Sequence, residues 1–145
     1  MPDWNLLPCE IRGIILKFVL LHQSIATYAA VSKEWQDVVE KKTFHRLKLH
    51  PPYLQILGKL SERRRGLVKH IWLNIELRRY ICQCCGGKES ATWLSANNKI
   101  MRTAITRLFN ILKSWELVKG GITLEINAYS PSDSGHWFKN CYFGA

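Results

Sequence analysis

A short run of cysteines offers the clearest set of metal-ligating side chains in the sequence. Cys82, Cys84 and Cys85 lie close together, and the first and last of them have the Cys-x-x-Cys spacing of zinc sites. A structural zinc ion needs four ligands, and the later candidates, His136 and Cys141, do not form a familiar second pair. We therefore expect a loop of free thiols here and no bound metal.

No other set of side chains has the spacing of a catalytic centre. Serine, histidine and acidic residues are present, but none lies in a nucleophile elbow, and no glycine-rich phosphate loop follows a predicted strand. The histidines are isolated from one another in the sequence, at His22, His45, His50, His70 and His136. We expect that the protein is not an enzyme and that it uses no cofactor.

Three N-terminal helices are the first elements that would position binding residues. Apolar residues recur at helical spacing in the first of them, and Pro8 and Glu10 suit its first turn. Ser24 and Ser32 are the expected caps of two shorter helices. The three helices are expected near residues 8–21, 24–31 and 33–42. Because helices this short are marginal in isolation, they must pack on one another.

The remainder of the chain is expected to alternate strands with helices, which makes the fold class α+β. Strands are expected at 68–77 and 122–128 from their period-two alternation, with helical segments near 53–65 and 98–115. Asn97 or Asn98 is the expected cap of the last helix. A strand–helix–strand unit normally has parallel strands, so this region is predicted to be a small, incomplete, leucine-rich-repeat-like α/β solenoid.

Three short motifs in the N-terminal helices form the most specific pattern in the sequence. They are Leu7-Pro8-Cys9-Glu10-Ile11, Ile15-Leu16 and Val31-Ser32-Lys33-Glu34-Trp35. Their order resembles the F-box family, whose pattern is Leu-Pro-x-Glu-hydrophobic, then Ile-Leu or Ile-Phe, then Val-Cys/Ser-Lys-x-Trp. Ser32 stands where cysteine is commoner in the family, and the spacing between the helices is slightly longer than usual.

The resemblance implies a three-helix F-box over residues 1–45 that docks on a Skp-family adaptor and, through it, on a cullin. The adaptor-binding residues would be Leu7, Pro8, Ile11, Ile15, Val31 and Trp35, in helix-in-groove recognition. Each also suits the core of a small helical domain, and Ile14 and Trp35 are expected to support that core. The protein would be the substrate-recognition subunit of an SCF-type ubiquitin ligase, holding an unknown protein target through residues 46–145.

Two segments of the later region are similar to fungal F-box proteins with long C-terminal substrate domains. They begin at His70, with His-Ile-Trp-Leu, and at Tyr129, with Tyr-Ser-Pro-Ser-Asp. The similarity implies that this chain is a shortened member of that group. Trp72, Trp93 and Trp137 are candidate anchors for a target, and core packing is the alternative role of each.

A formal net charge of +10 keeps a second function open, that of a basic helical nucleic-acid-binding protein. Three short helices can imitate a helix-turn-helix. Nucleic acid is nevertheless the less favoured partner, because Glu34, Asp37 and Glu40 lie on the helix that would have to enter the groove. The one dense arginine run, residues 63–65, is interpreted as a solvated face.

The sequence also indicates where the protein works. It begins without the basic segment and apolar core of a secretory signal. The longest apolar run, residues 14–21, falls short of the ~20 residues that a membrane helix needs. Five cysteines without a secretory context favour free thiols. We expect an intracellular protein of the cytoplasm or nucleus, with no membrane partner.

Overall fold

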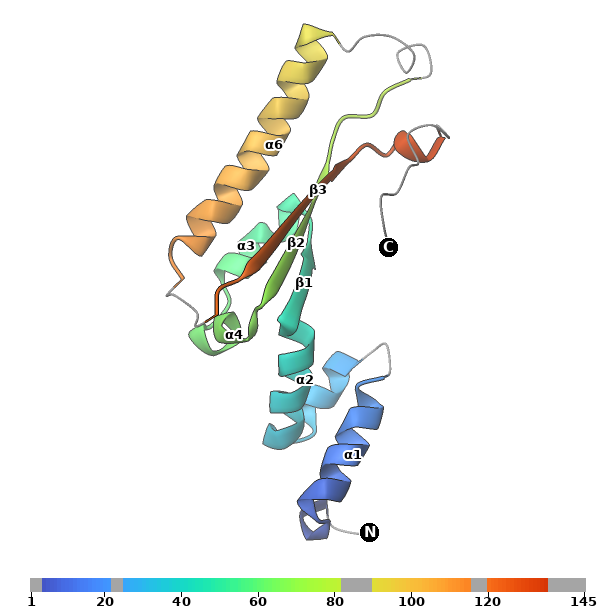
Figure 1. The fold of residues 1–145 in the computed structure, drawn as a ribbon, viewed down its shortest axis with the longest axis vertical. Helices are drawn as coiled ribbons and strands as arrows, with labels where there is room; N and C mark the ends of the chain where they lie inside the picture. Colours follow the sequence, from blue (N-terminus) through green and yellow to red (C-terminus); the bar gives the residue numbers. More distant parts are fainter. Residues whose placement is uncertain (1–3, 22–24, 82–89, 116–119, 136–145) are drawn as a thin grey trace. The chain divides into compact units, whose positions relative to one another are not determined.

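The structure is a computed structural model of the chain, and its α+β fold consists of two compact units (Figure 1). It describes residues 4–21, 25–81, 90–115 and 120–135. The first unit comprises Met1–Leu47 and Ser61–His70, and the second comprises Lys48–Leu60 and Ile71–Ala145. The first unit thus contains a short segment from the middle of the chain besides the N-terminal helices.

The first unit is helical. Its elements are η1 (Trp4–Leu6), α1 (Cys9–Val19), η2 (Ile25–Ala30), α2 (Lys33–His45) and α4 (Glu62–Leu67). Helix α1 begins directly after Pro8, whose carbonyl accepts a hydrogen bond from the Arg12 N–H at 3.1 Å. Helix α2 is capped by Ser32 as predicted, because the Ser32 hydroxyl accepts from the Trp35 N–H at 3.4 Å.

The second predicted helix is a 3₁₀ helix, η2, and not an α-helix. It ends with a hydrogen bond from the Val31 N–H to the Tyr28 carbonyl at 3.2 Å, which is the i→i−3 pattern of a 3₁₀ turn. A six-residue segment is too short to profit from the cooperative α-helical ladder. The predicted cap, Ser24, lies outside the described residues.

The second unit contains a three-stranded parallel sheet in the order β1-β2-β3. Its strands are β1 (Arg46–Leu49), β2 (His70–Glu76) and β3 (Thr123–Tyr129), of which the first two start within the first unit. The accompanying helices are η3 (Pro51–Tyr53), α3 (Leu54–Gly58), α6 (Ala91–Leu112) and η4 (Asp133–Gly135). The prediction of parallel neighbouring strands is confirmed for β2 and β3. Strand β1 was not predicted, because four residues are too few to show the period-two alternation of a strand.

The core of the second unit lies between the sheet and two helices. Alternation in β2 places Ile71, Leu73 and Ile75 on one face, and all three are fully buried. Helices α3 and α6 lie on one side of the sheet (Figure 1), and they contribute further buried residues, Leu54, Leu57, Ala104 and Leu108. Each fully buried Leu or Ile contributes roughly 1.5–3 kcal/mol to folding, so this packing holds the unit together.

Two predicted boundaries are wrong. Helix α6 starts well before Asn97, because the Ser90 hydroxyl accepts from the Trp93 N–H at 3.2 Å and caps the helix there. The Asn97 side chain accepts instead from the backbone N–H of Arg78 at 3.3 Å. The helical segment expected near 53–65 is two helices, α3 and α4, which belong to different units.

Candidate functional site: an uncovered apolar face on helix α1

Helix α1 has a broad apolar face, and the described residues of the first unit cover only part of it. Leu16 is buried, and Ile15 and Val19 are half-buried. Four other apolar residues are 43, 49, 65 and 79% exposed, in the order Ile11, Ile14, Phe18 and Leu21. The i, i+3, i+7 spacing of Ile11, Ile14 and Phe18 puts them on one face of α1, and Leu21 follows in the turn after the helix; we call these four residues the α1 stripe.

The predicted adaptor-binding residues fall into two groups. Pro8 and Ile11 are exposed at the start of α1, with Leu7 half-buried immediately before them, so these three form one end of the apolar surface. Val31 is 61% exposed in the turn after η2. Ile15 is half-buried, so contact with the rest of its own unit already occupies part of its surface.

Trp35, the sixth predicted residue, is part of an aromatic cluster inside the first unit. Its ring centroid lies 5.2 Å from that of Trp4 and 6.1 Å from that of Tyr28, both in tilted arrangements. The predicted core role of Trp35 agrees with this packing. The same prediction for Ile14 is wrong, because Ile14 is half exposed and Leu16 is the α1 residue that is buried.

The carboxylate of Glu34 joins the N-terminal segment to α2. The Trp4 indole N–H donates to Glu34 Oε2 at 2.9 Å, and the Arg12 guanidinium donates to the same oxygen at 3.2 Å. Charge-assisted hydrogen bonds of this kind are stronger than neutral ones. One acidic side chain therefore connects η1, α1 and α2, and it helps to determine which side of α1 stays uncovered.

A second ionic cluster joins α4 to α2 and corrects the interpretation of the arginine run as a solvated face. Arg63 Nη1 donates to Glu40 Oε2 at 2.6 Å, and Arg64 Nη2 donates to Glu40 Oε1 at 3.0 Å. Arg63 also forms an ion pair with Asp37. These contacts explain why Ser61–His70 belongs to the first unit, and they occupy two of the acidic side chains of α2.

Glu40 is 5% exposed, and its carboxylate is held in the charged form. Burial by itself raises the pKa of Glu40, but hydrogen bonds from Gln36 and Arg64 and the positive charges of Arg64 and Arg63 outweigh it, so the pKa is lowered from the ordinary 4.5. The Gln36 amide donates to Glu40 Oε1 at 2.9 Å. The cluster thus stabilises the first unit where carboxylates are ionised.

A groove of about 840 Å³ lies between α1 and α2, lined by α1 residues that are not part of the stripe. Its floor includes the apolar side chains of Leu16, Leu20 and Val38. Its rim is basic, with Lys17, Lys41, Lys42, His45 and Arg46. Since no acidic residue is among the described residues that line it, this groove attracts anionic groups.

The predicted target anchors have different surroundings in the second unit. Trp72 is half-buried on β2, and the Lys48 ammonium lies 4.2 Å from the centroid of a Trp72 ring, a cation–π contact. Trp93 is half-buried in the first turn of α6. Trp137 lies outside the described residues.

The prediction that the cysteine run binds no metal stays a prediction, because Cys82, Cys84 and Cys85 lie outside the described residues, as do His136 and Cys141. Within the described ranges, no group of three or more His, Cys, Asp or Glu side chains is placed to hold a metal ion. No helix in the same ranges combines the length and the apolar character needed to cross a membrane.

The predicted adaptor-binding set omits three residues of the α1 stripe, namely Ile14, Phe18 and Leu21. Their helical spacing from Ile11 is visible in the sequence. The same helix also contains Ile15, Leu16 and Val19, however, so the pattern alone does not tell which side is covered.

Comparison with known proteins gave no match to a family model, to a curated protein or to a solved structure. The function is therefore inferred from the residues and surfaces of the chain itself.

Proposed function

We propose that this chain is an F-box protein, the substrate-recognition subunit of an SCF-type ubiquitin ligase, and that its first unit docks on a Skp-family adaptor. The exposed α1 stripe is the observation that carries the proposal. Large apolar side chains that line one face of an ordered helix favour a partner that removes them from water. An amphipathic helix that lays this face into an apolar groove is a recurrent mode of recognition.

The motif residues support docking at the start of α1. Leu7, Pro8 and Ile11 continue the stripe towards the N-terminus, and the chain there is already held by the two hydrogen bonds to Glu34. A surface that is ordered before binding loses less conformational entropy on association. The Leu-Pro-x-Glu motif and the stripe would then form one continuous docking surface.

The second unit would hold the target protein. Its three parallel strands with helices on one side suit the start of a leucine-rich-repeat-like solenoid, in which the sheet recurs with each repeat. Linking adaptor docking and target binding in one chain raises the effective concentration of target lysines near the ligase. The protein would act by position, without a catalytic group or cofactor of its own.

Nucleic-acid binding is the second candidate function, and the basic rim of the α1–α2 groove is the observation that favours it. Lys41, Lys42 and Arg46 at the end of α2, with Lys17 of α1, would contact phosphates. Such binding is dominated by charge and weakens steeply with added salt. Docking through the apolar α1 stripe has no comparable salt dependence, so the two functions separate experimentally.

A calorimetric titration with a purified Skp-family adaptor tests the proposal. We expect the parent chain to bind, and a Leu7→Ala, Pro8→Ala double variant to bind more weakly by about 2 kcal/mol with little change in melting temperature. The loss follows from removing apolar contacts at the end of the docking surface. If the parent chain does not bind the adaptor but binds duplex DNA in a salt-dependent manner, the result supports nucleic-acid binding, the second candidate function.

A further inference from the structure

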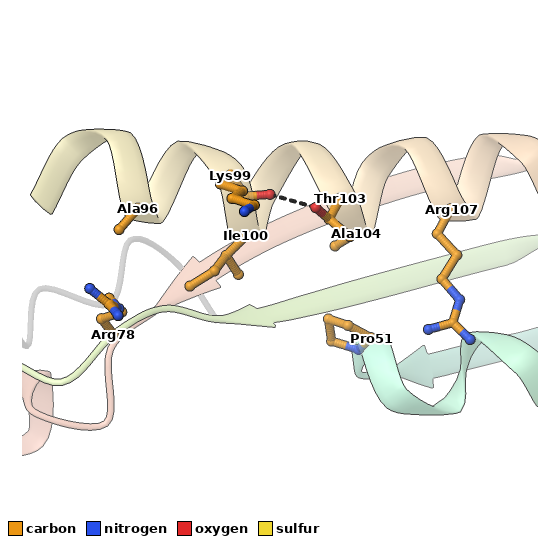
Figure 2. A pocket seen from close by; sticks show the side chains of 8 residues that line it. All are labelled: Pro51, Arg78, Ala96, Lys99, Ile100, Thr103, Ala104 and Arg107. Atoms are coloured by element: carbon orange, nitrogen blue, oxygen red, sulfur yellow. Dashed lines mark hydrogen bonds between the residues drawn. The ribbon is translucent and has the colours of Figure 1, made fainter. Parts of the chain in front are cut away.

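A hollow of about 490 Å³ lies along helix α6 in the second unit, and none of the residues proposed to dock the adaptor lines it (Figure 2). Its floor consists of small and apolar side chains, Pro51, Ala96, Ile100 and Ala104. This volume falls in the range of pockets that take small ligands or single peptide side chains. An apolar floor of this kind favours an apolar group in any ligand.

Three cations surround this floor. Lys99 and Arg107 project from α6, and Arg78 projects from the segment that follows β2 (Figure 2). No acidic residue is among the described residues that line the hollow, and the structure gives none of the three cations a carboxylate partner within the described ranges. Among the described residues, the hollow therefore has a positive rim with no acidic neighbour, around an apolar centre.

The backbone of Arg78 is held on both sides. Its N–H donates to Asn97 Oδ1 at 3.3 Å, and its carbonyl accepts from the Ser130 hydroxyl at 2.9 Å. Ser130 is itself fixed, since its backbone N–H donates to Asp133 Oδ2 at 2.8 Å. The Tyr80 hydroxyl donates to the other oxygen of Asp133 at 2.7 Å. The Ser-Pro-Ser-Asp turn thus holds the backbone of the segment from which the Arg78 side chain projects, and an ordered backbone loses less conformational entropy when an anion binds.

We propose that this hollow binds an extended peptide segment of the target in which an apolar residue lies between acidic side chains. Eight residues of helix separate Lys99 from Arg107, a rise of about 12 Å. An extended chain covers that distance in about four residues at ~3.3 Å per residue. Acidic residues about four positions apart would therefore meet the two cations, with the apolar residue between them over Ile100 and Ala104.

This inference deepens the proposed function by naming the kind of target segment, and it rests on the proposed target-holding role of the second unit. A peptide is favoured over nucleic acid because no aromatic side chain is among the described residues that line the hollow, so unstacked bases would have no stacking platform there. The arginine side chains suit carboxylates, to which they donate two parallel hydrogen bonds.

Fluorescence anisotropy with the full chain and a dye-labelled nine-residue peptide tests the inference. The peptide has glutamates at its third and seventh positions and a leucine at its fifth, with serine and glycine elsewhere. We expect saturable binding that weakens by about tenfold in Arg78→Gln and by at least that factor in a Lys99→Gln, Arg107→Gln double variant. Arg102→Gln is the matched control, because Arg102 is an exposed cation of the same helix that does not line the hollow.

Two altered peptides and one competitor complete the design. Replacing the glutamates by glutamine, or the leucine by serine, should each weaken binding by about tenfold or more. Equal losses in Arg102→Gln and the rim variants, or stronger displacement by a single-stranded oligonucleotide than by unlabelled peptide, would overturn the inference. The adaptor is absent from this assay, so a failure here with adaptor binding intact rejects the peptide site alone.

Discussion

Helices α1 and α6 have similar amphipathic patterns in the sequence but opposite surroundings in the structure. Helix α6 buries the centre of its apolar face, with Ala104 at 3% and Leu108 at 0% exposure. Helix α1 buries only Leu16, while Ile14 and Phe18 remain 49 and 65% exposed. The difference lies in the second layer of each unit: α6 packs with α3 on a sheet, whereas the described elements beside α1 in the first unit are helices.

An apolar helix face has to be buried against a second layer of structure. Its sequence pattern does not show whether the same chain or a partner chain supplies that layer. In the second unit the sheet supplies it, and the result is a closed core. In the first unit the described residues supply it on one side of α1 only. The α1 stripe is therefore the part of the first unit at which we infer a surface for the adaptor.

The largest expected effect concerns the core that α6 helps to form in the second unit. Leu108→Ala removes a fully buried side chain from the core of the second unit, so we expect the free energy of unfolding to fall by roughly 2–5 kcal/mol. Chemical denaturation followed by circular dichroism measures this. A loss below about 1 kcal/mol would mean that α6 is not packed on the sheet as described.

The next effect concerns the ionic cluster that completes the first unit. Glu40→Gln removes the carboxylate shared by Arg63 and Arg64, and we expect a loss of roughly 1–3 kcal/mol in unfolding free energy at neutral pH. The charge-conserving change Glu62→Asp serves as the control, because Glu62 is exposed at the start of α4. Equal effects of the two substitutions would show that the ionic cluster does not stabilise the first unit.

The pH dependence of the same cluster follows from the lowered pKa of Glu40. The carboxylate takes up a proton more readily in the unfolded chain than in the folded one, since its pKa is below the ordinary 4.5 in the folded state. The stabilisation is therefore present above the ordinary 4.5 and is lost as pH falls through that value and then through the lower pKa of the folded state. Unfolding measured from neutral to acidic pH should show a smaller acid-induced loss in Glu40→Gln than in the parent.

The sequence predicted the elements better than their surroundings. The helical pattern of α1, the Ser32 cap and the alternation in β2 are local properties, and each corresponds to what the structure shows. The burial of Leu16 in place of Ile14 depends on how the other elements of the first unit pack on α1, which no local pattern contains. The same holds for the acidic residues of α2, whose arginine partners come from distant parts of the chain.

The start of α6 gives a smaller and more local test of the comparison. Ser90→Ala removes the hydroxyl that accepts from the Trp93 N–H, and we expect a loss of about 1 kcal/mol in unfolding free energy. Asn98→Ala, at a position first predicted to cap this helix, should change stability by less than about 0.5 kcal/mol because Asn98 is exposed within the helix. A larger loss in Asn98→Ala than in Ser90→Ala would instead support the predicted start of the helix near residue 98.

The most direct test of the central claim uses variants that should change the stability of the chain only slightly. Phe18→Ser in the α1 stripe and Phe109→Ser on α6 alter phenylalanines that are 65 and 53% exposed, so each should change the free energy of unfolding by less than about 1 kcal/mol. Calorimetric titration of both variants and the parent with a purified Skp-family adaptor is the decisive measurement. We predict that Phe18→Ser binds more weakly than the parent by at least about tenfold and that Phe109→Ser binds like the parent. Equal binding by all three chains would contradict the assignment of the α1 stripe as the adaptor-docking surface.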